Sequence, residues 1–192
     1  MSVSLSKGGR VSLSKEAPGL KNIKIGLGWD TNATDTGADF DLDSSMFMVG
    51  ADGKVTADSD FIFFNNLKSA DGSVVHEGDN LTGEGDGDDE VINVDLSKVD
   101  AKYQTLAITV TIHEAQSRGQ NFGQVNNSFI RIVNADDGKE LTKFELDEDY
   151  SSETAILFGT LYRKDGEWRF KAEGSGFNSG LEGFCKTYGV GV

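Results

Sequence analysis

The sequence LAITVTIH at residues 106–113 decides the fold class, because apolar and polar side chains alternate along it with a period of two. Side chains two residues apart share one face of an extended strand. The apolar face of this segment is formed by Leu106, Ile108, Val110 and Ile112. The segment therefore predicts a β-strand that has one face in a hydrophobic core.

The same pattern recurs on both sides of this segment. Residues 23–29 place four apolar side chains on one face, those of Ile23, Ile25, Leu27 and Trp29. The sequence FIFF at residues 61–64 is apolar on both faces and predicts a central strand. Further short apolar segments lie at residues 91–96, 129–133, 141–146, 155–163 and 167–172. Together they predict an all-β fold, a two-sheet antiparallel β-sandwich of about ten strands with a few short helices, and a closed β-barrel is the alternative.

Short segments rich in glycine and aspartate predict where the chain reverses. ADDG at residues 135–138 and KDG at residues 164–166 each separate two strand-like segments and predict β-hairpins. Gly8-Gly9 separates two copies of VSLSK and predicts a third hairpin. Residues 97–103 are predicted to form a helical turn with Ser97 as its cap, and residues 181–185 a short helix.

The composition is that of an acidic chain of 192 residues with a formal net charge of −14. This length fits one domain over residues 1–192. So much negative charge repels nucleic acid and anionic lipid unless cations neutralise it, so we expect no nucleic-acid partner. Cys185 is the single cysteine of the sequence, which favours a reducing compartment. We find no signal-peptide core and no apolar run of membrane-spanning length, so we expect a cytoplasmic protein that does not insert into the membrane.

An acidic loop at residues 77–90 contains seven carboxylates and neither lysine nor arginine. The seven are Glu77, Asp79, Glu84, Asp86, Asp88, Asp89 and Glu90. The glycines between them let the backbone adopt positive φ angles and turn carbonyl oxygens inward. Since Ca²⁺ binds six to eight such oxygen ligands at about 2.3–2.6 Å, the acidic loop predicts a calcium site.

Ligand chemistry separates calcium from other common metals. Zn²⁺ prefers cysteine and histidine, and the acidic loop contains neither. Mg²⁺ demands a tighter octahedral geometry, whereas Mn²⁺ remains an alternative on oxygen ligands alone. The loop does not match the EF-hand pattern, because Leu81 stands at the third position from Asp79 and Val91 at the glycine position from Asp86.

A second set of carboxylates lies on a predicted strand. Asp39, Asp41 and Asp43 alternate with Phe40 and Leu42, so the three carboxylates share one face at intervals of about 6–7 Å. Such a row favours a bound cation, and a solvated strand edge is the alternative. With the acidic loop this makes about ten carboxylates, which is more charge than one Ca²⁺ offsets. We therefore predict two neighbouring Ca²⁺ ions bridged by shared carboxylates.

Several motifs make the chain resemble the TerD family of bacterial tellurium-resistance and stress-response proteins. They are GWD at 28–30, FDLD at 40–43, FIFFNN at 61–66, GDNLTGEGDGDDE at 78–90, VTIH at 110–113, QNFGQV at 120–125, FIRI at 129–132 and LYR at 161–163. The resemblance covers nearly the whole chain, and the long acidic loop is its most specific part.

The resemblance implies a β-sandwich with a pair of adjacent Ca²⁺ sites. It also implies a calcium-dependent scaffold that works beside membrane-bound partner proteins of the same gene cluster, at the inner face of the membrane. Carried over to this sequence, the implied metal ligands are Asp41, Asp43, Asn65, Asp79, Asn80, Asp86, Asp88 and Glu90, with a carbonyl oxygen from Gly83. Glu84 joins this predicted set as a further carboxylate of the acidic loop.

These observations predict an adaptor without enzymatic activity, in which Ca²⁺ orders the acidic loop and creates a surface for a protein partner. One cysteine and no cofactor motif cannot reduce a tellurium oxyanion, so resistance is expected to be indirect. Two alternatives stay open: a metal-dependent hydrolase with His113 as a candidate base, and calcium-bridged binding to anionic lipid. His76, which precedes the acidic loop, is predicted to have a structural role.

Overall fold

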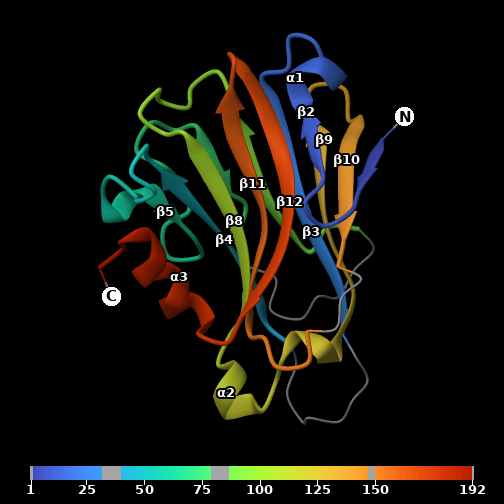
Figure 1. The fold of residues 1–192 in the computed structure, drawn as a ribbon, viewed down its shortest axis with the longest axis vertical. Coiled ribbons are helices and arrows are strands. Elements are labelled where there is room, and N and C mark those ends of the chain that lie inside the picture. Colours follow the sequence, from blue (N-terminus) through green and yellow to red (C-terminus); the bar gives the residue numbers. More distant parts are fainter. Residues whose placement is uncertain (1, 32–39, 79–86, 147–149, 192) are drawn as a thin grey trace.

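A computed structural model describes residues 2–31, 40–78, 87–146 and 150–191. These residues form two six-stranded sheets that pack face to face (Figure 1). The predicted β-sandwich is therefore confirmed. The sheets contain twelve strands where about ten were predicted, and four of them, β1, β2, β5 and β6, are only two or three residues long.

Each sheet has a distinct strand order. Sheet A contains, in spatial order, β1 (Val3–Leu5), β10 (Glu140–Glu145), β9 (Val125–Asn134), β3 (Asn22–Thr31), β7 (Glu90–Asp95) and β6 (Val74–His76). Sheet B contains β2 (Arg10–Ser12), β12 (Glu167–Phe177), β11 (Ala155–Lys164), β8 (Thr105–Ile112), β4 (Leu42–Val49) and β5 (Phe61–Ile62). The helices are α1 (Leu13–Glu16), α2 (Ala115–Arg118) and α3 (Gly180–Tyr188), with 3₁₀ turns η1 (Asp58–Asp60) and η2 (Phe122–Gln124). Among these described helices, none combines the length and apolar character that a membrane span requires.

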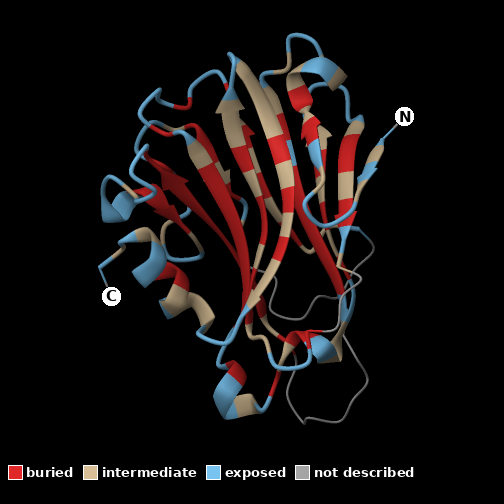
Figure 2. Cartoon of the chain, in the orientation of Figure 1, coloured by how far each residue is buried: buried red, intermediate tan, exposed pale blue. Residues whose placement is uncertain are grey.

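The core lies between the sheets, where the buried sides of the strands face one another (Figure 2). β8 pairs with β4 on one side and with β11 on the other, and its four predicted apolar residues are at most 4% exposed. Phe40 and Leu42 are also buried in this core, at 2% and 1% exposure. The period-two pattern at residues 40–43 is thus confirmed for the apolar side chains.

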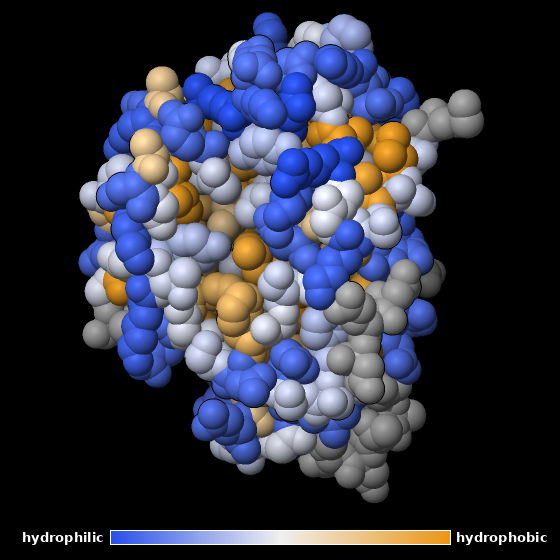
Figure 3. Space-filling view, in the orientation of Figure 1, coloured by the Kyte–Doolittle hydropathy of each residue, from blue (hydrophilic) through white to orange (hydrophobic). Residues whose placement is uncertain are grey.

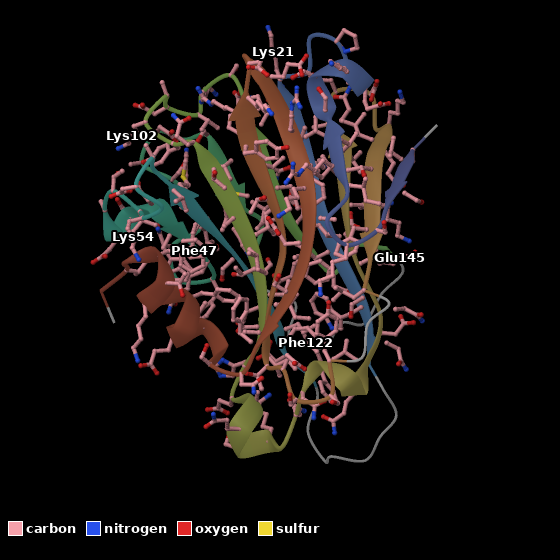
Figure 4. The ribbon with its side chains drawn as sticks, in the orientation of Figure 1. Lys21, Phe47, Lys54, Lys102, Phe122 and Glu145 are labelled. Atoms are coloured by element: carbon pink, nitrogen blue, oxygen red, sulfur yellow. The ribbon has the colours of Figure 1, made fainter. Side chains whose placement is uncertain are left out.

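A second, smaller core lies on the outer face of sheet B beneath α3. Phe47 of β4 stacks on Phe61 with ring centroids 4.5 Å apart, and it also contacts Phe184 and Tyr188 of α3. Figure 4 shows the labelled Phe47 between the strands and this helix. The predicted short helix at residues 181–185 is therefore confirmed, and it covers a face of the sheet that would otherwise be exposed.

The prediction of a central strand at residues 61–64 is wrong. β5 has only two residues and lies at the edge of sheet B, paired with β4 alone among the described strands. Ile62 points into the sandwich core, whereas Phe61 packs under α3. This edge strand is apolar on both faces because the sandwich core covers its inner face and α3 covers its outer face.

The predicted hairpin around Gly8-Gly9 is also wrong. β1 pairs in parallel with β10 of sheet A, whereas β2 pairs antiparallel with β12 of sheet B. Gly8 has φ +80°, and its N–H donates to the carbonyl of Ala172 in β12. The two VSLSK segments thus belong to opposite sheets. A Gly-Gly turn suits a hairpin, but it also suits a chain that passes from one sheet of a sandwich to the other.

The two other predicted hairpins are confirmed. β9 and β10 are antiparallel neighbours, and so are β11 and β12. Asp165 and Gly166 both have positive φ, which matches the twist of the strands that they join. The helical turn predicted at residues 97–103 is wrong, because Asp95 accepts the N–H and the hydroxyl of Ser97 and forms a turn there instead.

Candidate metal centre

The predicted metal ligands that the structure describes belong to segments that meet one end of the sandwich, the lower end in Figure 1. β3 and β6 end there, and β4 and β7 begin there. Five of the ten predicted ligands, Asp79, Asn80, Gly83, Glu84 and Asp86, lie outside the described residues, as does Asp39. Their assignment stays a prediction.

Glu90 begins β7 and points between the two sheets, where its side chain is only 1% exposed. The N–H of Ser44 in β4 donates to Glu90 Oε2 at 2.7 Å. Nε2 of His76 in β6 lies 3.5 Å from the same oxygen. This buried carboxylate therefore links sheet A to sheet B.

Asp41 and Asp43 lie at the start of β4. Asp43 faces the outer side of sheet B, opposite to the neighbouring Ser44. Its Oδ2 lies 3.7 Å from Nδ1 of His113, and the carbonyl of Asp41 accepts the N–H of His113 at 2.8 Å. Asn65 is exposed in the turn that follows β5. These predicted ligands thus flank sheet B, whereas Glu90 lies inside the sandwich.

Asp88 lies on the outer face of sheet A. Its two oxygens accept hydrogen bonds from Nε and Nη2 of Arg131 in β9, at 2.7 and 3.1 Å. These bonds raise the pKa of the Arg131 guanidinium. The carboxylate reaches Arg131 by crossing β3 at Gly26, where a Cβ atom would come within 2.2 Å of it. A metal ion at Asp88 would therefore share this carboxylate with Arg131.

Negative charge is crowded around Asp89. Its Oδ2 accepts the backbone N–H of Trp29 at 2.8 Å. Burial raises the pKa of Asp89, and the nearby charges of Asp30 and Asp88 raise it further, although the Trp29 hydrogen bond opposes them. A cation at this end of sheet A would relieve that repulsion.

Gly28 lets Gly87, in the acidic loop, lie close to β3. A Cβ atom at Gly28 would come within 2.4 Å of the Phe129 ring and 2.8 Å of the Gly87 carbonyl oxygen. We expect Gly28→Ala to lower the free energy of unfolding by about 1–3 kcal/mol, because a ring or a backbone segment must move. Urea denaturation measures this change.

Gly50→Ala is the matched control, since its added Cβ would meet no atom closer than 3.4 Å. It should change the free energy of unfolding by no more than about 0.5 kcal/mol. Equal effects of the two substitutions would show that the contacts of Gly28 impose no constraint.

The donor chemistry at this end of the sandwich fits a hard divalent cation. Within the described residues, no three histidine, cysteine, aspartate or glutamate side chains are grouped so that they could hold a metal ion. The candidates are nevertheless carboxylates, which Ca²⁺ prefers, and the crowding around Asp89 favours a positive charge. Asp43, Asp88 and Glu90 face three different sides of the two sheets, so a Ca²⁺ ion held by any one of them would need further ligands from residues 79–86.

Sequence patterns alone missed the contacts of His76, Ser44 and Arg131. His76 and Ser44 are buried at 2% and 1% exposure. A histidine beside an acidic segment is the signal that the sequence contains, but its burial is not visible there and its partner Ser44 is 32 residues away. Arg131 lies inside the FIRI motif, and its pairing with Asp88 depends on the order of strands in sheet A.

Comparison with known proteins identifies the family. A family model described as the TerD domain matches residues 1–188. The chain is 57% identical over 190 residues to "Tellurium resistance protein TerD" of Serratia marcescens, covering 99% of this chain and 98% of that protein. It is 53% identical over 192 residues to "General stress protein 16U" of Bacillus subtilis (strain 168), covering all of both chains.

The fold recurs in a solved structure. A homologue of telluride resistance protein from Streptomyces coelicolor A3(2) superposes with a TM-score of 0.71, covering 86% of this chain and 95% of that one. At 23% identity this likeness shows the fold alone. The full-length match of the family model and the identity to the curated relatives carry the assignment: this chain belongs to the TerD family of tellurium-resistance and stress-response proteins.

Proposed function

We propose that this protein is a calcium-binding scaffold of the tellurium-resistance and stress-response system, and that it is not an enzyme. The observation that carries the calcium proposal is the half-buried Asp89 carboxylate beside Asp30 and Asp88: burial raises its pKa, and the two neighbouring charges raise it further. A divalent cation offsets such charge, and the oxygen donors suit Ca²⁺. Two neighbouring ions remain our hypothesis for a site that also includes the acidic loop.

The thiol chemistry of the chain supports an indirect role in resistance. Cys185 is 2% exposed in α3, and burial raises its pKa, with a smaller contribution from Asp58. A buried thiol of raised pKa is a poor nucleophile and a poor reductant. We therefore propose that the protein does not reduce tellurite itself, and that it works in the cytoplasm.

A protein partner is part of this proposal. The exposed large apolar side chains of the described residues are Phe64, Leu67 and Phe177. Phe177 packs edge-on against Phe184 of α3, and a hollow of about 360 Å³ lies between α3 and β5. Figure 3 shows apolar atoms gathered beside α3 on the face that it draws. Such a surface suits a protein partner, and we propose that this partner belongs to the same gene cluster and is membrane-bound in some cases.

Calcium is expected to raise the melting temperature of chelator-treated protein by roughly 5–10 °C at about 100 times its dissociation constant. Ligand that binds only the folded state adds about 2.7 kcal/mol of stability under this condition. Mg²⁺ at the same concentration should give little shift, because it dehydrates reluctantly and demands octahedral geometry. Differential scanning fluorimetry with both ions measures the difference, and equal shifts would contradict calcium selectivity.

A metal-dependent hydrolase is a second candidate, favoured by one observation. Asp43 and His113 line a hollow of about 550 Å³, and Ser117 and Ser179 also line it. The 3.7 Å between Asp43 Oδ2 and His113 Nδ1 is too long for a hydrogen bond, so the pair does not form a catalytic dyad as it stands. Calcium-dependent phosphoester hydrolysis that disappears in His113→Ala would establish this candidate.

A further inference from the structure

His76 is buried at the end of β6 and uses both ring nitrogens. Its Nδ1 accepts the backbone N–H of Gly78 at 3.0 Å. Its Nε2 lies 2.9 Å from Oγ and 3.2 Å from the carbonyl oxygen of Ser44, and 3.5 Å from Oε2 of Glu90. We call His76, Gly78, Ser44 and Glu90 the His76 network.

The hydrogen bond from Gly78 fixes the proton on the imidazole. A neutral ring has one nitrogen that donates and one that accepts. Because Nδ1 accepts from Gly78, the ring proton belongs on Nε2, where the oxygens of Ser44 and Glu90 surround it. The ring therefore has one orientation and one tautomer that satisfy both sides.

The His76 network joins β4 to both sides of residues 79–86, and so to the segments that carry every predicted ligand except Asn65. Gly78 immediately precedes residues 79–86, Glu90 follows them at the start of β7, and Ser44 follows Asp43 in β4. The two flanks of the acidic loop are thus held to each other, and both are held to sheet B, by one buried side chain.

We propose that His76 is a positioning residue for the calcium site, which sets the distance between Gly78 and Glu90 and orients the Glu90 carboxylate. This inference rests on the proposed calcium binding. Side chains that orient metal ligands without touching the metal typically contribute 10–100-fold to metal affinity, because they fix the ligands before the ion binds. The ordering that His76 provides would otherwise have to be supplied during calcium binding.

Two substitutions separate the two sides of the ring. In His76→Asn the side-chain oxygen takes the place of Nδ1, so the Gly78 bond is kept and the contacts with Ser44 and Glu90 are lost. In His76→Gln the side-chain amide reaches the place of Nε2, so the contacts with Ser44 and Glu90 are kept and the bond from Gly78 is lost. We expect calorimetric titration of the chelator-treated proteins with CaCl₂ to give affinities about 10–100-fold below that of the unaltered protein in both variants.

Ser69→Ala is the control for a loss of stability near β6. Ser69 is buried, and its hydroxyl oxygen accepts the N–H of Val74 at 2.9 Å, but it has no contact with the His76 network among the described interactions. This variant should melt at a lower temperature and keep the calcium affinity within about twofold. A loss of affinity in Ser69→Ala as large as in the His76 variants would overturn the positioning role.

Imidazole ¹⁵N spectra of the chelator-treated protein test the geometry without calcium. A neutral ring protonated on Nε2 is expected, and protonation on Nδ1 would refute the network. If the unaltered protein binds no Ca²⁺, the proposed function fails, whatever the tautomer. If it binds Ca²⁺ and both His76 variants bind equally well, the positioning role fails and the proposed function stands.

Discussion

Replacing Glu90 with alanine is expected to lower the free energy of unfolding by about 3–5 kcal/mol even without calcium. The substitution removes a carboxylate that is 1% exposed, leaves the N–H of Ser44 without its acceptor and takes away the charge beside His76, whose ring keeps its contacts with Ser44 and Gly78. Each unsatisfied buried donor costs about 1–3 kcal/mol, and the lost side chain leaves a cavity. Urea denaturation in the presence of a chelator measures the loss.

Glu90→Gln separates stability from metal binding at the same position. The amide oxygen can still accept the N–H of Ser44, so most of the stability should remain. The charge is gone, so calcium affinity should fall by at least tenfold if Glu90 is a ligand. A Glu90→Gln protein that binds calcium as tightly as the unaltered one would remove Glu90 from the ligand set.

The sandwich could be predicted because its signals are local. The alternation at residues 106–112 is visible in the sequence, and so is the Asp165-Gly166 turn. The failures concern partners that lie far along the chain. Nothing near residues 61–64 shows that α3, more than 110 residues later, covers their outer face, and nothing near Gly8 shows which sheet accepts each flank.

At the candidate site, too, local sequence signals could be predicted and contacts between distant segments could not. The acidic segment is a compositional signal, but the burial of Glu90 at its end, among partners that a buried carboxylate needs, is visible only in the fold. The register of β7 against β3 points Glu90 between the sheets, whereas Asp88 precedes β7 and reaches Arg131 across Gly26 on the outer face of sheet A. A shift of one residue would turn Glu90 out of the sandwich, and the sequence alone does not set that register.

Replacing Asp60 with alanine is expected to have a similarly large effect, a loss of about 3–5 kcal/mol. Asp60 is 2% exposed and ends η1 just before β5. Its carboxylate accepts the backbone N–H groups of Thr56 and Ala57, each at 3.0 Å, and the hydroxyls of Thr56 and Tyr103, each at 2.5 Å. Alanine would leave four donors without this acceptor, and β5 would lose the turn that positions it.

The same carboxylate gives this prediction a pH dependence. Burial alone would raise the pKa of Asp60, but the hydrogen bonds from Thr56, Tyr103 and Ala57 outweigh it and hold the pKa below the usual 3.8. A carboxyl whose pKa is lower in the folded state binds its proton less readily there than in the unfolded chain. Its contribution is therefore complete above about pH 4 and is lost as the pH falls through the folded-state value.

The difference in unfolding free energy between the unaltered protein and Asp60→Ala should accordingly be constant from about pH 7 to pH 5 and shrink below pH 4. Comparing the two proteins cancels the carboxyls that titrate in both. Asp58→Asn is the matched control, because Asp58 is exposed and the amide can still accept the N–H of Gly191. It should change stability by no more than about 0.5 kcal/mol at any of these pH values. A difference for Asp60→Ala that stays constant down to pH 3 would mean that the hydrogen bonds at Asp60 do not depend on its charge.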